Sequence, residues 1–175
     1  MKVSNEEWQL KLDNLNSRRK YEVIKNDFAE VDDYESHINK CYIGKTILDV
    51  GCGLQLIKQF VPNSLYVGLD PTQMISTSIP MTIEECNFAE NSFETIYCFA
   101  TLDGLRDLQL AAKQMKKIAS KNIVILNGID IKPDQYHTHN ITIQTLTDMF
   151  GDWKIGTKEF ITYKVLLIEY LKNES

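Results

Sequence analysis

The feature that most constrains this chain is the stretch at residues 45–53, Lys-Thr-Ile-Leu-Asp-Val-Gly-Cys-Gly. Residues 46–50 form a short apolar run that ends in an acid and leads into a Gly-x-Gly pair, a pattern typical of a buried parallel strand. Glycine tolerates positive φ and lets a ligand approach the backbone, so Gly51 and Gly53 predict a tight turn beneath a bound molecule. Apolar residues at helical spacing over residues 54–60 predict that a helix follows, with its free N–H groups directed at the same place.

A second apolar run, residues 65–70, predicts another buried strand and ends in Asp70. Asp70 lies about twenty residues beyond the first strand, where a carboxylate at a strand end accepts hydrogen bonds from both hydroxyls of a ribose. An aspartate in such a place also caps loops and helices, and that interpretation stays open. Its combination with the glycine turn favours a ligand of the nucleotide type.

The run Ile-Leu-Asp-Val-Gly-Cys-Gly at residues 47–53 resembles the first motif of the class I S-adenosylmethionine-dependent methyltransferases, and Asp70 matches their second. The resemblance is to the small-molecule, type 11-like branch and extends over residues 46–171. A dinucleotide-binding fingerprint is the rival, but it needs a third glycine where this chain has Leu56. The resemblance implies S-adenosylmethionine as cofactor, S-adenosylhomocysteine as product, and a small-molecule, sugar or lipid-linked acceptor.

The resemblance also implies which residues contact the cofactor, with the adenine at the turn of residues 82–83. The chain departs from the family at residues 71–81, where members usually have a full helix and a third strand, and this segment is too short and too rich in Ser, Thr and Pro for a long helix. The implied cofactor-binding residues are Asp49, Gly51, Cys52, Gly53, Asp70, Pro71, Thr82, Ile83 and Phe99.

Strand and helix patterns alternate along the rest of the chain, which indicates a doubly wound α/β sheet. The resemblance implies a mostly parallel, Rossmann-like sheet of about seven strands, with an antiparallel last strand and a shortened region after the second strand. Beyond residue 90 we expect strands at residues 95–100, 123–127, 153–160 and 164–171, and helices at 108–118 and 142–150. Two further helices, at residues 6–20 and 31–40, are expected before the first strand.

The length of 175 residues fits a single domain, residues 1–175, with an N-terminal helical segment at 1–44 and the core at 45–171. The net charge of −5 argues against a nucleic-acid partner, because such binding depends on neutralising phosphates. No apolar run is long enough to cross a bilayer and the first residues do not form a signal peptide, so we expect a cytoplasmic protein without a membrane span. The four cysteines are widely spaced, so neither a zinc site nor a disulfide framework is predicted.

Three residues are candidates for the catalytic chemistry: Asp103, His137 and His139. They lie in loops that follow the fourth and fifth strands of the family pattern, at the edge where open α/β sheets bind ligands. If residues 136–139 are extended, alternation puts both imidazoles on one side, which suits acceptor contact or proton transfer. Two histidines without a third ligand predict no metal site, and loop histidines facing water, or Asp103 capping its turn, remain the alternatives.

Two other functions stay open. A non-catalytic protein that binds a cofactor or a partner through the same fold is supported by the short segment at residues 71–81 and by Gln55, which stands where the family often has glycine. A nicotinamide-dependent oxidoreductase is disfavoured by Leu56. The sequence names neither the acceptor nor the oligomeric state.

Overall fold

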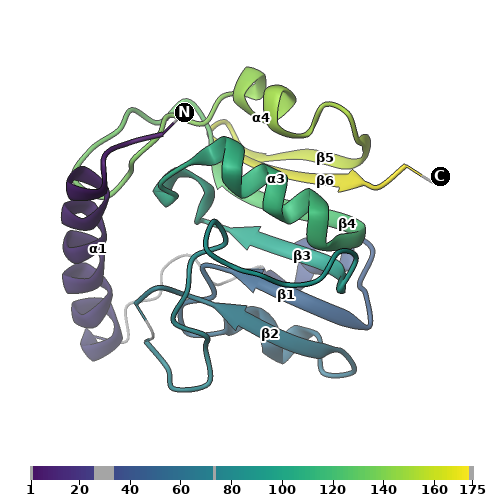
Figure 1. Ribbon diagram of the computed structural model, residues 1–175, viewed down its shortest axis with the longest axis horizontal. Coiled ribbons are helices and arrows are strands. Elements are labelled where there is room, and N and C mark those ends of the chain that lie inside the picture. The colour runs from purple at the N-terminus through teal and green to yellow at the C-terminus, as the bar shows by residue number, and fades with distance from the viewer. Residues whose placement is uncertain (1, 26–33, 73, 174–175) are drawn as a thin grey trace.

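The computed structural model describes residues 2–25, 34–72 and 74–173, and is built on a six-stranded sheet with the order β2-β1-β3-β4-β6-β5 (Figure 1). The first four strands are parallel, whereas β6 is antiparallel to both of its neighbours. The strands are β1 Thr46–Val50, β2 Leu65–Leu69, β3 Phe93–Phe99, β4 Ala119–Gly128, β5 Lys154–Thr162 and β6 Val165–Leu171. The helices are α1 Asn5–Lys25, α2 Tyr34–Asn39, α3 Leu108–Ile118 and α4 Ile143–Phe150, with short 3-10 helices η1 Leu56–Phe60 and η2 Leu102–Gly104.

Helices cover both faces of the sheet, as expected for a doubly wound fold. α3 and α4 pack on one face, where α3 buries Leu108, Ala111, Met115 and Ile118 at helical spacing. α2 and η1 pack on the other face. Because the central strands are covered on both sides, residues 122–127 of β4 are buried without alternation. The prediction of a mostly parallel α/β sheet is confirmed.

The sheet has six strands rather than about seven, and the difference lies in the shortened segment at residues 71–81. In place of a strand, this segment forms a single parallel β-bridge to β2, between Leu69 and Ile79. The Ile79 N–H donates to the Gly68 carbonyl at 2.9 Å, and the Asp70 N–H donates to the Ile79 carbonyl at 3.1 Å. A parallel strand needs a crossover of about a dozen or more residues, and the segment is too short to supply both the crossover and the strand.

The prediction of a regular helix at residues 54–60 is wrong, because only the short 3-10 helix η1 forms there. Gln55 adopts the left-handed conformation, with φ 56° and ψ 40°, immediately before η1. A residue in the left-handed conformation does not fit the first turn of an α-helix. Helical hydrogen bonding therefore begins only after Gln55 and is limited to the short 3-10 helix η1. The α4 prediction is confirmed with its cap, since Thr142 Oγ1 accepts the Thr145 N–H at 3.0 Å. The helix expected at residues 31–40 is α2, and residues 31–33 lie outside the described residues.

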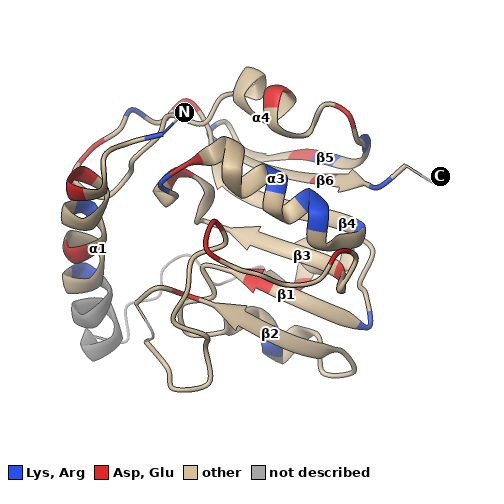
Figure 2. Ribbon diagram, in the orientation of Figure 1, with Lys and Arg blue, Asp and Glu red and all other residues tan. Residues whose placement is uncertain are grey.

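Helix α1 lies apart from both faces and runs across the carboxyl ends of the parallel strands (Figure 1). Its start is held by the Val3 N–H, which donates to the Arg106 carbonyl at 3.1 Å. Acidic and basic residues alternate along the part of α1 that is coloured in Figure 2. No helix in the described part of the chain combines the length and the hydropathy that a membrane span requires. The four cysteines are buried and form no disulfide bond.

Candidate active site

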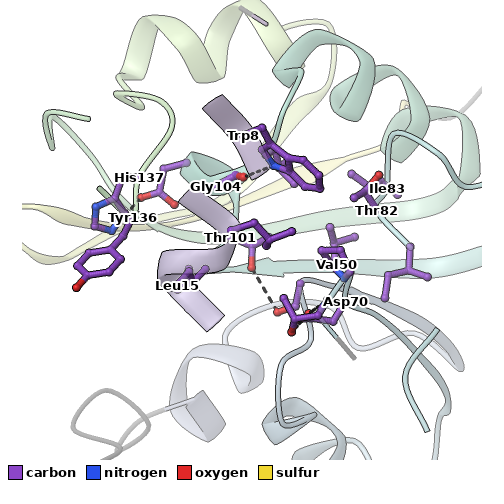
Figure 3. Close-up of a pocket in the computed structure, with 18 of the residues that line it drawn as sticks. Trp8, Leu15, Val50, Asp70, Thr82, Ile83, Thr101, Gly104, Tyr136 and His137 are labelled. Atoms are coloured by element: carbon purple, nitrogen blue, oxygen red, sulfur yellow. Dashed lines mark hydrogen bonds and ion pairs between the residues drawn. The ribbon is translucent and has the colours of Figure 1, made fainter. Parts of the chain in front are cut away.

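A pocket lies at the carboxyl ends of β1, β2 and β3, beneath α1. Figure 3 shows Thr82 and Ile83 at one end of the pocket, and Tyr136 and His137 at the other. Gly51 and Asp70 line the pocket as well. The pocket therefore brings together the glycine turn, the end of β2 and the loop after β4. Of the predicted site residues, those that line it are Gly51, Asp70, Pro71, Thr82, Ile83, Asp103 and His137.

The glycine turn presents bare backbone to this pocket. Gly51 has a φ of 70°, and its N–H and that of Cys52 both donate to the Leu69 carbonyl, at 2.8 and 2.9 Å. A Cβ atom on Gly51 would come within 2.2 Å of Thr101 Oγ1. Glycine is thus required at residue 51 both for its conformation and for space. Cys52 does not line the pocket, because its thiol is 7% exposed and packs toward Gly68.

Asp70 is a buried carboxylate, 1% exposed, that joins two loops at the pocket wall. Its Oδ2 accepts the Gly53 N–H at 2.9 Å. Its Oδ1 accepts the N–H and the hydroxyl of Thr72, at 2.8 and 2.5 Å. Asp70 therefore caps loop N–H groups, as the alternative interpretation predicted. Its contact with the ribose remains a prediction. Gly53, with a φ of 47°, contributes to the site through Asp70 and does not line the pocket.

Asp49 and Phe99 also lie behind the pocket wall rather than on it. Asp49 is 3% exposed, and the Tyr66 hydroxyl of β2 donates to its Oδ2. Burial raises the pKa of Asp49 to about 7, which the Tyr66 hydrogen bond opposes and the nearby Asp70 reinforces. Phe99 packs edge-on against Tyr34 in the core, with ring centroids 5.3 Å apart. Asp49 and Phe99 are not among the residues that line the pocket, so the lining does not support the expected direct contacts of these two residues with the cofactor.

Thr82 carries a polar atom that the protein itself leaves unpaired. Its Oγ1 is buried and has no hydrogen-bond partner among the described residues, although Thr82 and the fully buried Ile83 both line the pocket. An unsatisfied buried hydroxyl costs about 1–3 kcal/mol. A ligand that offers a donor or an acceptor here would remove that cost.

Two of the three catalytic candidates, Asp103 and His137, come together at the far end of the pocket. His137 Nε2 lies 3.9 Å from Asp103 Oδ2, and His137 Nδ1 lies 2.9 Å from Asp134 Oδ1. Burial raises the pKa of Asp103, and the neighbouring His137 opposes this shift. The imidazole is thus flanked by a carboxylate at each ring nitrogen.

His139, in contrast, does not line the pocket. The N–H groups of Thr138 and His139 both donate to the Asp103 carbonyl, at 2.8 and 2.9 Å, which turns the chain between the two histidines. The His139 side chain is 4% exposed, and burial lowers its pKa. The expectation that an extended strand would place both imidazoles on one side is wrong for this loop.

The sequence interpretation missed the residues that close the pocket from above. Trp8, Leu12 and Leu15 of α1 line it, and the Trp8 Nε1–H donates to the Gly104 carbonyl at 3.1 Å (Figure 3). Their shared helical face was visible in the sequence, but nothing indicated what that face contacts. Asp134 was missed as well, although an aspartate after a proline and three residues before His137 is a turn signal.

Comparison with known proteins shows the fold. No protein-family model matches the chain, and no curated protein matches its sequence. The structure of 1,6-didemethyltoxoflavin-N1-methyltransferase from Burkholderia thailandensis, with bound 1,6-didemethyltoxoflavin and S-adenosylhomocysteine, matches with a TM-score of 0.73 and 12% identity. The match covers 98% of this chain and 92% of that chain.

Two further structures give the same result. The plantazolicin methyltransferase BpumL, in complex with a monoazolic desmethylPZN analog and S-adenosylhomocysteine, matches with a TM-score of 0.67 and 13% identity over 95% of this chain and 94% of that chain. Magnesium protoporphyrin IX methyltransferase from Synechocystis, with bound S-adenosylmethionine, matches with a TM-score of 0.58 and 11% identity over 92% and 79%. The chain has the fold of the class I S-adenosylmethionine-dependent methyltransferases.

Proposed function

We propose that this protein transfers a methyl group from S-adenosylmethionine to a small-molecule acceptor. The observation that carries the proposal is that Gly51, Asp70 and Thr82 surround one pocket at the carboxyl ends of β1–β3. Ligands of open α/β sheets bind at this edge. The methyltransferases of the same fold named above hold S-adenosylmethionine or S-adenosylhomocysteine, which supports the same cofactor here.

The residues at one end of the pocket fit a nucleoside that carries an amino acid. Gly51 presents bare backbone to the pocket at a positive φ, which suits close approach of the methionine portion. The Asp70 carboxylate suits the ribose hydroxyls, and the unpaired Thr82 hydroxyl suits the polar edge of the adenine. Leu56, where a dinucleotide site needs glycine, argues for this cofactor over a diphosphate.

The other end of the pocket would hold the acceptor. When bound, S-adenosylmethionine supplies a methyl group on a positively charged sulfur. The protein's task is then to align the acceptor and exclude water, and alignment alone contributes about 7–11 kcal/mol. Trp8, Leu12 and Leu15 form an apolar cover that suits a small, largely apolar molecule better than a sugar. Of the three predicted catalytic residues the proposal retains His137 and Asp103, because these two line the pocket.

A second candidate is a protein of the same fold that binds the cofactor or a partner without catalysis. The missing strand beside β2, reduced to the Leu69–Ile79 bridge, favours it because this region shapes the adenine side of the pocket. Turnover distinguishes the two candidates.

Calorimetry with S-adenosylhomocysteine and with NAD tests the cofactor assignment. We expect binding of S-adenosylhomocysteine alone, and a loss of about 0.5–1.5 kcal/mol in its binding free energy in Thr82→Val, the range for one hydrogen bond. Thr147→Val is the matched control, because Thr147 is an exposed threonine of α4 away from the pocket. Release of S-adenosylhomocysteine from S-adenosylmethionine is then screened with phenols, azoles, amines and sugars.

Each outcome discriminates between the functions. Binding of S-adenosylhomocysteine together with turnover of one acceptor class supports the methyltransferase. Binding with no turnover of any class would favour the non-catalytic candidate. Binding of NAD without S-adenosylhomocysteine would contradict both.

A further inference from the structure

The His137 ring is fixed by a carboxylate that the main chain in turn holds in place. Asp134 Oδ1 lies 2.9 Å from His137 Nδ1 and also accepts the N–H groups of Tyr136 and His137, at 2.7 and 2.8 Å. An ionised carboxylate only accepts hydrogen bonds, so it holds the proton of the neutral imidazole on Nδ1. The lone pair of the imidazole is then on Nε2.

The other ring nitrogen lies near a second carboxylate at the edge of the pocket. His137 Nε2 is 3.9 Å from Asp103 Oδ2, too far for a direct hydrogen bond, and both residues line the pocket. The side chain of His137 is 32% exposed, whereas that of Asp103 is 11% exposed. A proton that arrives on Nε2 would lie beside the Asp103 carboxylate.

Other residues that line the pocket are apolar and aromatic. Trp8 and Leu12 line it from α1 and Leu105 from the segment after η2. Tyr136 lines it beside His137 (Figure 3). Aromatic faces and leucines favour a flat, apolar molecule, with polar groups at only a few points.

No described lysine or arginine side chain lines the pocket. Three described cations contact residues that line it: Lys11 Nζ donates to the His137 carbonyl at 3.0 Å, the Arg18 guanidinium lies 5.2 Å from the Tyr136 ring centroid, and that of Arg106 lies 5.9 Å from the Trp8 ring centroid. An acceptor with a phosphate or carboxylate would meet Asp103 with no cation of the described lining to pair with, and burying such a charge is costly. The described lining therefore favours an uncharged acceptor over an anionic one.

We infer that His137 accepts the proton of the methyl acceptor, that Asp134 is its positioning residue, and that the acceptor is an uncharged aromatic molecule whose methylated oxygen or nitrogen carries that proton. This inference rests on the proposed function. The acceptor atom bonds to the methyl carbon as the carbon–sulfur bond breaks, and the electrons of that bond remain on sulfur, which leaves S-adenosylhomocysteine. The proton of the acceptor passes to Nε2 of His137 and then to water.

Proton transfer can be observed without turnover by using 4-nitrophenol, whose ionised form absorbs at a different wavelength from the neutral form. The probe is bound to the protein saturated with S-adenosylhomocysteine, and its ionisation is followed against pH. We expect the ionisation midpoint of the bound probe to be higher by about one pH unit or more in His137→Gln than in the wild type, and intermediate in Asp134→Asn. The charged and titratable groups near the ring are Asp134 and Tyr136 of its own loop and Asp103 of η2. From α1, Lys11 Nζ donates to the His137 carbonyl and the Arg18 guanidinium lies over the Tyr136 ring.

Asp130→Asn is the matched control for the loop variants. Asp130 is exposed and has a φ of 55°, which asparagine tolerates. We expect the ionisation midpoint of the bound probe to be unchanged in this variant. An unchanged midpoint in His137→Gln would overturn the inference, as would failure of the wild-type complex to bind the probe.

A matched pair of acceptors tests the substrate class by turnover. Benzimidazole carries an N–H group whose nitrogen becomes a nucleophile when a base removes the proton. 1-Methylbenzimidazole has no such proton and presents only the ring nitrogen that can be methylated without a base. We expect methylation of benzimidazole only, with turnover lowered by about a hundredfold or more in His137→Gln. Equal methylation of both compounds would overturn the inference and leave the proposed function intact, whereas failure to bind S-adenosylhomocysteine would contradict the proposed function itself.

Discussion

The Gly53 N–H donates to the Asp70 carboxylate at 2.9 Å and thereby ties the turn after β1 to the carboxyl end of β2. The two residues that identify the nucleotide-type pattern in the sequence are thus hydrogen-bonded partners in the fold. Asp70 holds the shape of the glycine turn from within the wall of the pocket. This dual position means that stability and ligand affinity are coupled at Asp70.

Replacement of Asp70 by alanine should therefore have two effects. The lost hydrogen bonds to a charged group should weaken S-adenosylhomocysteine binding by about 1.5–3 kcal/mol, measured by calorimetry. The midpoint of thermal unfolding should also fall, because the Gly53 N–H loses its partner. Thr72→Val is the control, since it removes one hydroxyl donor and keeps the carboxylate. A fall in stability with unchanged affinity would assign Asp70 to the turn alone.

Gly51 and Gly104 form a matched pair for the glycine turn, because both line the pocket. Gly51→Ala should lower the free energy of unfolding by about 1–3 kcal/mol, since alanine is strained at a φ of 70° and its Cβ would meet Thr101 at 2.2 Å. Gly104→Ala should leave stability unchanged, because nothing lies within 4 Å of the added Cβ. Denaturant titration of both variants measures the difference, and equal losses would show that the turn is not the cause.

The buried Asp49 predicts a pH dependence of stability. Its pKa is about 7 in the folded protein, raised by burial from an ordinary value of 3.8. Between these values the folded state binds more protons than the unfolded state, so the contribution of Asp49 to stability is fully present below about pH 4 and is lost as the pH rises through 7. The Asp49→Asn variant removes this dependence, so its unfolding free energy should exceed that of the wild type by more at pH 8 than at pH 5.

Asp148→Asn is the control for Asp49, because Asp148 is an exposed aspartate of α4. Its stability should follow the wild type across the same range of pH, as judged by urea unfolding at each pH. A wild-type profile that rises from pH 5 to pH 8 in parallel with that of Asp49→Asn would show that Asp49 does not titrate in this range.

Trp8 should report ligand binding, because it is the tryptophan that lines the pocket, while Trp153 packs against the core elsewhere. In the Trp153→Phe background Trp8 is the only remaining tryptophan, and its emission should change as S-adenosylhomocysteine is added. In Trp8→Phe the remaining emission should stay constant over the same titration. A response carried by Trp153 would contradict a cover formed by α1.

The sequence by itself determined the class of fold and the centre of the site. Apolar runs of strand length separated by helical patterns are local signals, and they predicted α3, α4 and each of the six strands to within a few residues. The Gly51 turn was predictable for the same reason, since a positive φ is a property of the backbone at that residue. The left-handed Gln55, which shortened the expected helix to η1, is the local feature that periodicity did not predict.

Only the tertiary structure decided what covers the pocket and which groups meet at its far end. Trp8 and Gly104 are 96 positions apart, and periodicity marks the apolar side of α1 without naming its partner. The loop after β4 has no regular period, so its turn around Asp103 and the separation of His137 from His139 follow from long-range hydrogen bonds. A sequence pattern constrains each segment separately, whereas a site depends on the distances between segments, and those are set by packing the whole chain.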